Sequence, residues 1–290
     1  MSALRSISTA CLLLFVSATA LPAQQKANLG DNAALRYWSA FAQMQDAAIS
    51  DKDARELKLI VEGTAPYDDL KYKELVEKNR FALKTMSRGT ALKRCDWGLD
   101  YELGPETPVD YVRKSLALGR LNVLYALHLL IAGDNDGAVQ TLVAGLRFSH
   151  DVANGGTLFA TMASKSLIVA HLGSIAGVNH VQGLSGAQRV LLQDALAQFG
   201  REGLDWQAAM KRELSLHPPA GADPESSAAM ARITSAYLKI FDNPSSLAEL
   251  QRTLASAPRS LQDIIPDPKR VLEEKQDLSE RLQQTRALLQ

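Results

Sequence analysis

Signals that begin and end helices recur along this chain, and they constrain its fold more than any other feature. Asp223-Pro224, Asn243-Pro244 and Asp267-Pro268 each set a capping side chain before a proline at the first helical position, where the missing N–H costs no hydrogen bond. Gly63 and Gly133 stand where helical periodicity stops. No stretch of the sequence combines sustained period-two alternation with β-branched enrichment. The sequence therefore predicts an all-α protein, an irregular array of about ten antiparallel helices.

Two long helices are expected in the first half of the chain. Thr64-Ala65-Pro66 predicts a polar helix that runs to the region of Ala91, and Thr107-Pro108 predicts a helix that ends at Gly133. The second half of the latter, LNVLYALHLLIA, is apolar on every side, which favours burial between neighbouring helices. We expect this helix at the centre of the core. Farther along, Gly173 and Gly177 predict a helix face that a neighbour's backbone approaches closely.

The first 23 residues have the pattern of a secretory signal peptide. Arg5 gives a basic start, residues 10–16 (ACLLLFV) give a short apolar run, and cleavage is expected after Ala20 or Ala23. We expect residues 24–290 to form a single helical domain in the periplasm or outside the cell. The stretch HPPAGADPESS favours a mobile loop or an internal break near residues 217–224.

Composition argues against several classes of partner. Acidic and basic residues balance at 32 each, which gives no electrostatic basis for binding nucleic acid. The N-terminal apolar run is too short to span a bilayer, and later apolar stretches are interrupted by residues such as His128 and Lys165, so no stable membrane span is expected. Only Cys95 remains after signal cleavage, so no internal disulfide can form.

Residues 121–152 have the pattern of a helical hairpin. Ala126 and Ala138 stand at small positions, and Leu142 stands at a large apolar position. The hairpin resembles one tetratricopeptide unit, which implies a tetratricopeptide-like, α-solenoid-like core with a peptide groove, although no second copy follows at the period of about 34 residues. The signal peptide together with NAALRYWSAFA, CDWGLDYELGP and GGTLFATMASKSL resembles a group of uncharacterised exported bacterial helical proteins. That resemblance implies no activity.

The sequence lacks the motifs that metal and catalytic sites require. It contains no H-E-x-x-H, no cysteine cluster and no G-x-S-x-G. The run Asp134-Asn135-Asp136-Gly137 begins like a calcium loop but lacks the glutamate at its twelfth position. His128, His150, His171 and His180 fall on or beside core helices, and we interpret them as core or helix-end residues. We therefore predict no catalytic residue, no metal and no cofactor.

Residues 94–108, RCDWGLDYELGPETP, are the one segment where several functional residue types crowd together. We interpret Trp97 and Leu99 as anchors that hold the loop on the core. Short carboxylates bind turn amides well, which is the role expected of Asp96 and Asp100. A catalytic thiolate at Cys95 would need a histidine or cationic partner that the sequence does not assign. The alternative of ligand contact predicts a set of five residues: Asp96, Trp97, Asp100, Tyr101 and Arg120.

Three functions stay open at this point. The leading hypothesis is an exported, non-enzymatic helical interaction or scaffold protein that binds a peptide, a protein or an apolar ligand. One alternative is an enzyme of unknown class with its site around residues 95–102. The other is a structural envelope component that forms a homo-oligomer through residues 267–290. The apolar stripe of that segment follows a heptad only partly: Val271, Leu278, Leu282 and Leu289.

Overall fold

The computed structural model describes residues 29–45, 51–217 and 224–290, and the predicted signal peptide therefore lies outside the described residues. Within these ranges the chain is all-α and contains no strand, as the sequence predicts. The α-helices are α1 (Ala33–Gln43), α2 (Asp51–Val61), α3 (Asp69–Gly89), α4 (Asp110–Ile131), α5 (Asn135–Ala153), α6 (Leu158–Gln182), α7 (Gly186–Ala197), α8 (Trp206–Ser215), α9 (Pro224–Asp242), α10 (Leu247–Ala255), α11 (Arg259–Gln262) and α12 (Pro268–Leu289). Short 3₁₀ segments are η1 (Leu29–Asp31), η2 (Tyr101–Glu106) and η4 (Pro244–Ser246).

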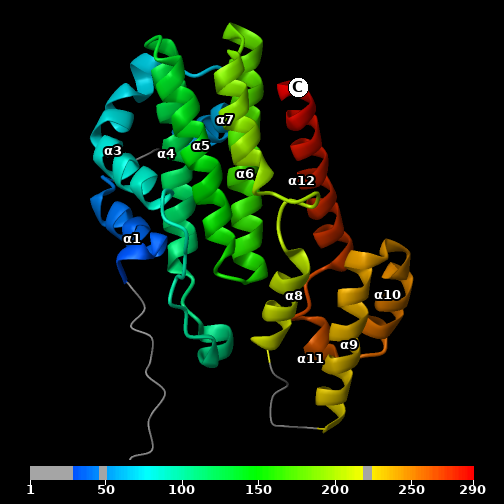
Figure 1. The fold of residues 1–290 in the computed structure, drawn as a ribbon. Helices are drawn as coiled ribbons and strands as arrows, with labels where there is room; N and C mark the ends of the chain where they lie inside the picture. Colours follow the sequence, from blue (N-terminus) through cyan, green and yellow to red (C-terminus); the bar gives the residue numbers. More distant parts are fainter. Residues whose placement is uncertain (1–28, 46–50, 218–223) are drawn as a thin grey trace, which may run out of the picture. The chain divides into compact units, whose positions relative to one another are not determined.

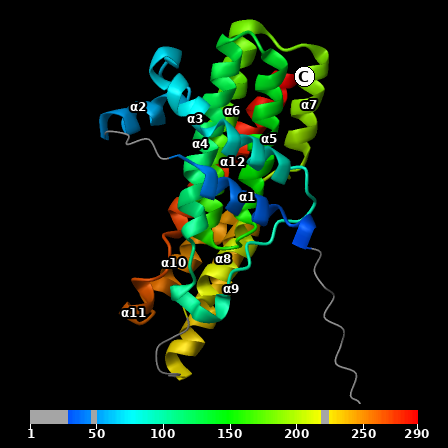
Figure 2. The same cartoon turned by 90° about the vertical axis from the view of Figure 1, so that its left-hand side faces the viewer.

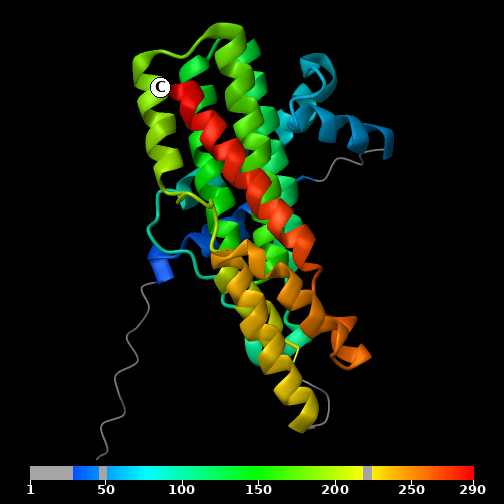
Figure 3. The ribbon, with the colours of Figure 1, turned by 90° about the vertical axis from the view of Figure 1, so that its right-hand side faces the viewer.

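Helices α4, α5 and α6 lie side by side and alternate in direction (Figure 1), and each contacts the other two. Helix α1 packs on α3 and α4, and α3 packs on α4 and α5 (Figure 2). Helix α12 runs across α6 and α7 (Figure 3). Residues 31–290 form one compact unit. The expected break near residues 217–224 falls largely on the undescribed stretch 218–223, and the flanking helices α8 and α9 pack against each other.

Most predicted helix starts are confirmed by a side chain that accepts a hydrogen bond from the first turn. Ser185 forms a complete capping box with Gln188 at the start of α7. Pro244 and Pro268 stand in the first turn of η4 and α12, as their missing N–H groups predict. The other confirmed caps are Asn32, Asp134, Asn243 and Asp267.

Two predicted starts are wrong, because each threonine hydroxyl has a nearer partner in a turn. Thr64 Oγ1 donates to Leu59 O at 3.0 Å and so helps to end α2, while α3 begins later with Asp68 as its cap. Thr107 Oγ1 donates to Gly104 O at 2.7 Å and closes the η2 turn, while α4 begins at Asp110 without a side-chain cap. A hydroxyl before a proline is therefore not sufficient to begin a helix here.

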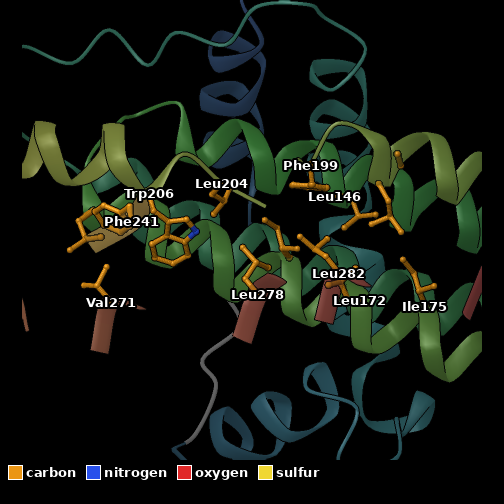
Figure 4. Close-up of a cluster of buried hydrophobic side chains, with 14 of the residues drawn as sticks. Leu146, Leu172, Ile175, Phe199, Leu204, Trp206, Phe241, Val271, Leu278 and Leu282 are labelled. Atoms are coloured by element: carbon orange, nitrogen blue, oxygen red, sulfur yellow. The ribbon is translucent and has the colours of Figure 1, made fainter. Parts of the chain in front are cut away.

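The largest core cluster joins the central helices to the C-terminal part of the chain. Figure 4 shows Leu278 and Leu282 of α12 among side chains of α5, α6 and the segment before α8. The apolar stripe that predicts self-association is thus buried inside its own chain. These four side chains are therefore not exposed to a second copy, and a homo-oligomer through residues 267–290 stays a prediction.

A buried polar cluster joins α4, α5 and α6 where they cross. His171 is fully buried, with Nδ1 2.7 Å from Leu167 O and Nε2 3.0 Å from the Asn122 side chain. Burial lowers the pKa of His171 to about 4, so the ring is neutral at physiological pH. Its Nδ1–H donates to Leu167 O, and Nε2 accepts when the NH₂ of Asn122 faces it. Gly145 makes room for the ring, because a Cβ there would lie 2.0 Å from His171 Nε2.

The variant Gly145→Ala tests this crossing. The added methyl group clashes with His171 and Asn122, so we expect a loss of about 1–3 kcal/mol in the free energy of unfolding in urea. Gly177→Ala on α6 is the matched control, because a Cβ there meets nothing within 4 Å. The control should gain up to about 1 kcal/mol from the better helix propensity of alanine. Equal effects of the two substitutions would contradict a tight crossing at Gly145.

Candidate functional site

The loop at residues 94–109 covers the C-terminal end of α5. The Trp97 indole donates to Asp151 O at 2.9 Å, and the Cys95 thiol lies 3.7 Å from the same oxygen. Tyr101 donates to Gly155 O, and Tyr111 donates to Val152 O at 3.3 Å. The last carbonyl groups of a helix have no partner within the helix, and these side chains supply one. The loop therefore acts as a cap for α5.

The two carboxylates of the loop bind amides of the loop itself, as the sequence predicts. Asp96 Oδ1 accepts from Gly98 N at 3.0 Å, and Asp100 Oδ1 accepts from Glu102 N at 3.0 Å. The backbone N–H and C=O of Asp96 are both bonded to the side chain of Asn32. These contacts give the carboxylates a structural role in the turn, and they lend no support to an enzyme site at residues 95–102.

Trp97 faces the core. Its side chain is 6% exposed, and its ring stacks on Tyr111 with centroids 4.2 Å apart. Tyr37 and Phe41 of α1 complete the cluster. The loop is thereby fixed to α1, α4 and α5 through one buried indole.

Trp97→Ala should lower the free energy of unfolding by about 3–5 kcal/mol, because it removes a buried ring and one of the hydrogen bonds to Asp151 O. Trp38→Ala is the control from the same aromatic cluster, since Trp38 is 41% exposed. We expect the control to lose less, about 2 kcal/mol. Urea unfolding followed by circular dichroism measures both. A loss at Trp97 no larger than at Trp38 would show that the indole does not anchor the loop.

Arg120 does not join the loop residues. It lies on α4 and faces a different cavity, so the five predicted ligand-contact residues do not form one site. Asp96, Trp97, Asp100 and Tyr101 do not line that cavity or the apolar groove described below.

Behind the loop, sequence reasoning missed a half-buried carboxyl group. Tyr37 donates to Asp151 Oδ2 at 2.5 Å, and burial raises the pKa of Asp151 to about 6. Burial also raises the pKa of the Cys95 thiol, with the nearby carboxylates adding to the effect. A protonated thiol is a weak nucleophile, which disfavours thiol chemistry. The two partners Tyr37 and Asp151 lie on separate helices far apart in sequence, and no motif connects them.

Asp151→Asn should change the pH dependence of stability. The folded pKa of about 6 exceeds the ordinary value of 3.8, so proton binding by Asp151 stabilises the fold below pH 3.8, and this contribution is lost as the pH rises through 6. Asparagine keeps an acceptor for Tyr37 without the charge. Relative to the unmodified chain, the variant should gain about 2 kcal/mol between pH 4 and pH 8. Urea unfolding at pH 4, 6 and 8 measures this difference, and a difference independent of pH would contradict the buried-carboxyl assignment.

His128 belongs to an ion cluster between α3 and α4. Its Nδ1 lies 2.6 Å from Asp69 Oδ1, and its Nε2 lies 3.5 Å from Glu77 Oε1. Tyr67 donates to the same Asp69 oxygen at 3.2 Å. Among the described residues no group of three or more histidine, cysteine or carboxylate side chains is arranged to hold a metal ion. The contacts of His128 with Asp69 and Glu77 join α3 to α4.

An apolar groove lies between α4, α6 and the connection from α2 to α3, and we call it the apolar groove throughout. Its volume is about 440 Å³. On α6 it exposes the backbone at Gly173 and Gly177, the two glycines that predict a close approach. The approaching chain is the end of α2, because a Cβ on Gly173 would lie 3.5 Å from Glu62 O, whereas Gly177 is open. Its apolar walls are Ile60, Pro66, Leu127, Leu130, Ile131 and Val178.

A second cavity, the charged cavity, lies between α2, α4, α6 and α12. Its volume is about 610 Å³. Apolar side chains of α4 and α6 form its floor, among them Leu116, Leu167 and Val169. The charged residues that line it are Lys58, Glu62, Arg120, Lys165, Asp277 and Arg281.

One helix of the described chain, α6, contains a stretch that is long and apolar enough to cross a bilayer, Leu158–Val178. In the structure 67% of that stretch is buried against other parts of the chain. A core helix of a soluble protein passes the same test, so this finding is weak evidence for a membrane span. Comparisons with protein-family models, with curated proteins and with solved structures find no match to this chain.

Proposed function

We propose that this protein is an exported helical binding protein that holds an apolar ligand in the apolar groove. The observation that carries the proposal is the groove itself, a concave surface of about 440 Å³ lined by aliphatic side chains and open glycine backbone. Ligand sites are typically hollows of about 300–1,000 Å³ with apolar walls and few polar groups. The pattern of residues 1–23 supports export.

The polar groups at the groove are few. Thr64, Tyr67 and Ser174 are the side chains there that carry hydroxyl groups. Ile131 at the rim is 59% exposed, although it is a large aliphatic residue at the end of α4. Apolar surface of this kind, gathered in a hollow, favours binding of an apolar molecule over a purely structural role.

The contacts of the loop at residues 94–109 support a binding role over catalysis. Its carboxylates bind loop amides, and the pKa of its thiol is raised. The apolar stripe of α12 is buried in its own chain, which favours binding over assembly through that helix.

The test uses the full chain and an uncharged fluorescent apolar probe, N-phenyl-1-naphthylamine. Saturable binding is expected, and Gly177→Leu should weaken it at least about tenfold, because the added side chain fills the groove. Gly186→Leu is the matched control on α7, where a Cβ also meets nothing within 4 Å but no groove is present. It should leave the affinity unchanged. The proposal fails if the probe does not bind, or if it binds the Gly177→Leu variant as tightly as the unmodified chain.

A further inference from the structure

Two helices end at the apolar groove. Helix α2 brings Ile60 and the turn at Gly63 to it, and the last turn of α4 brings Leu130 and Ile131. The C-terminal end of a helix carries partial negative charge, because its last carbonyl groups lack partners within the helix. No described residue of α5 or α7 lines the groove, so the positive ends of these helices do not contribute to its walls. The helix ends at the groove therefore favour a cationic group over an anionic one.

The hydroxyl groups of the groove face a ligand as acceptors. Thr64 and Ser174 each donate to a backbone carbonyl group at 3.0 Å. Tyr67 donates to Asp69 Oδ1 at 3.2 Å. A hydroxyl has one hydrogen and two lone pairs, and these three hydrogens are already used within the chain. The lone pairs that remain can bind a donor such as an ammonium group but not a carboxylate.

Carboxylates predominate in the chain around the groove. Within three residues of the residues that line it, the sequence contains four carboxylates and one lysine: Glu62, Asp68, Asp69, Asp134 and Lys58. Lys58 lies 3.8 Å from Glu62, and this ion pair leaves three carboxylates and no further lysine or arginine. Three residues of chain span at most roughly 11 Å, so these charges lie near the groove. Asp68 and Asp69 also offset the positive end of α3, which begins there.

Tyr67 connects the groove to an ionised carboxylate. The hydrogen bond to His128, whose Nδ1 lies 2.6 Å away, holds the pKa of Asp69 below its usual value, with smaller contributions from Tyr67 and Lys73. Glu77 Oε1 lies 3.5 Å from Nε2 of His128, so carboxylates face this ring on both sides. Burial, together with Asp69, raises the pKa of Tyr67, and the phenol keeps the hydrogen that it donates to Asp69. A cation that donates to the Tyr67 oxygen would therefore lie one hydrogen bond from a full negative charge.

We propose that the ligand of the apolar groove is a free aliphatic amine, which binds with its hydrocarbon chain against the aliphatic walls and its ammonium group at the Tyr67 hydroxyl. This inference rests on the proposed function, since it names the chemical class of the ligand for the same groove. A neutral alcohol would make the hydrogen bond without the attraction of the nearby carboxylates, and a carboxylate would face lone pairs and like charge. A hollow of about 440 Å³ accommodates one small ligand, so the occupant is a single molecule.

The test compares three probes that share a ten-carbon chain: decylamine, decanol and decanoate. They are titrated into the full chain at pH 7, below their aggregation concentrations, and followed by calorimetry. At this pH the amine is protonated, as a lysine side chain is. Decylamine should bind about tenfold more tightly than decanol, and decanoate should bind more weakly than either. Raising the salt concentration should weaken decylamine and leave decanol unchanged.

Two variants test the place of the ammonium group. Asp69→Asn should lower the affinity for decylamine about fivefold, and unchanged binding of decanol shows that the groove is intact in the variant. Tyr67→Phe keeps the aromatic ring and removes the accepting oxygen, so the preference for decylamine over decanol should fall from about tenfold to about threefold or less. Asp110→Asn is the matched control, because it removes the same charge from the start of α4, roughly 25 Å from Leu127 along the helix. It should leave the affinities unchanged.

The outcomes separate this inference from the proposed function. Equal affinity for decylamine and decanol, or tighter binding of decanoate, overturns the amine assignment and leaves the groove as an apolar site. Equal losses in Asp69→Asn and Asp110→Asn would show a general effect of net charge and would also overturn the amine assignment. Absence of binding by all three ten-carbon probes overturns both proposals.

Discussion

The close crossing of α4, α5 and α6 at Gly145 is the contact on which the rest of the structure depends. At this crossing the ring of His171 packs between helices without a buried charge, because the ring is neutral. Both of its nitrogen atoms have hydrogen-bond partners, Leu167 O and the Asn122 side chain. The crossing also sets the spacing of α4 and α6, which both line the apolar groove and the charged cavity. A shift of this crossing would alter both cavities and the end of α5 that the loop at residues 94–109 caps.

The parts of the fold that the sequence predicts well are local. An Asp134 or Asp267 cap forms a hydrogen bond within three residues, so its evidence lies in a few letters. Thr64 and Thr107 mislead because a turn brings a carbonyl group closer than the helix start. The position of α12 against α6 cannot be predicted in this way, since it depends on shape complementarity between surfaces far apart in sequence.

The same distinction applies to the sites. The roles of Asp96 and Asp100 are local turn contacts and follow from residue type. The predicted ligand-contact set includes Arg120 with the loop residues, yet the position of Arg120 on α4 directs it to another cavity. The sequence indicates one part of the apolar groove, the glycines at 173 and 177. The residues that line its other side belong to α2 and α4, and no spacing rule identifies these residues.

The path of α12 has a consequence for how the chain reaches this structure. Lys165 on α6 is paired with Glu274 on α12, and the largest core cluster includes Leu289, next to the C-terminus. Contacts between segments so distant in sequence form late, after the loop-closure entropy of the intervening chain has been overcome. Until α12 packs, the apolar faces of α6 and α7 that it covers stay uncovered. A chain in which α12 has not yet docked therefore exposes apolar surface that favours association with other chains.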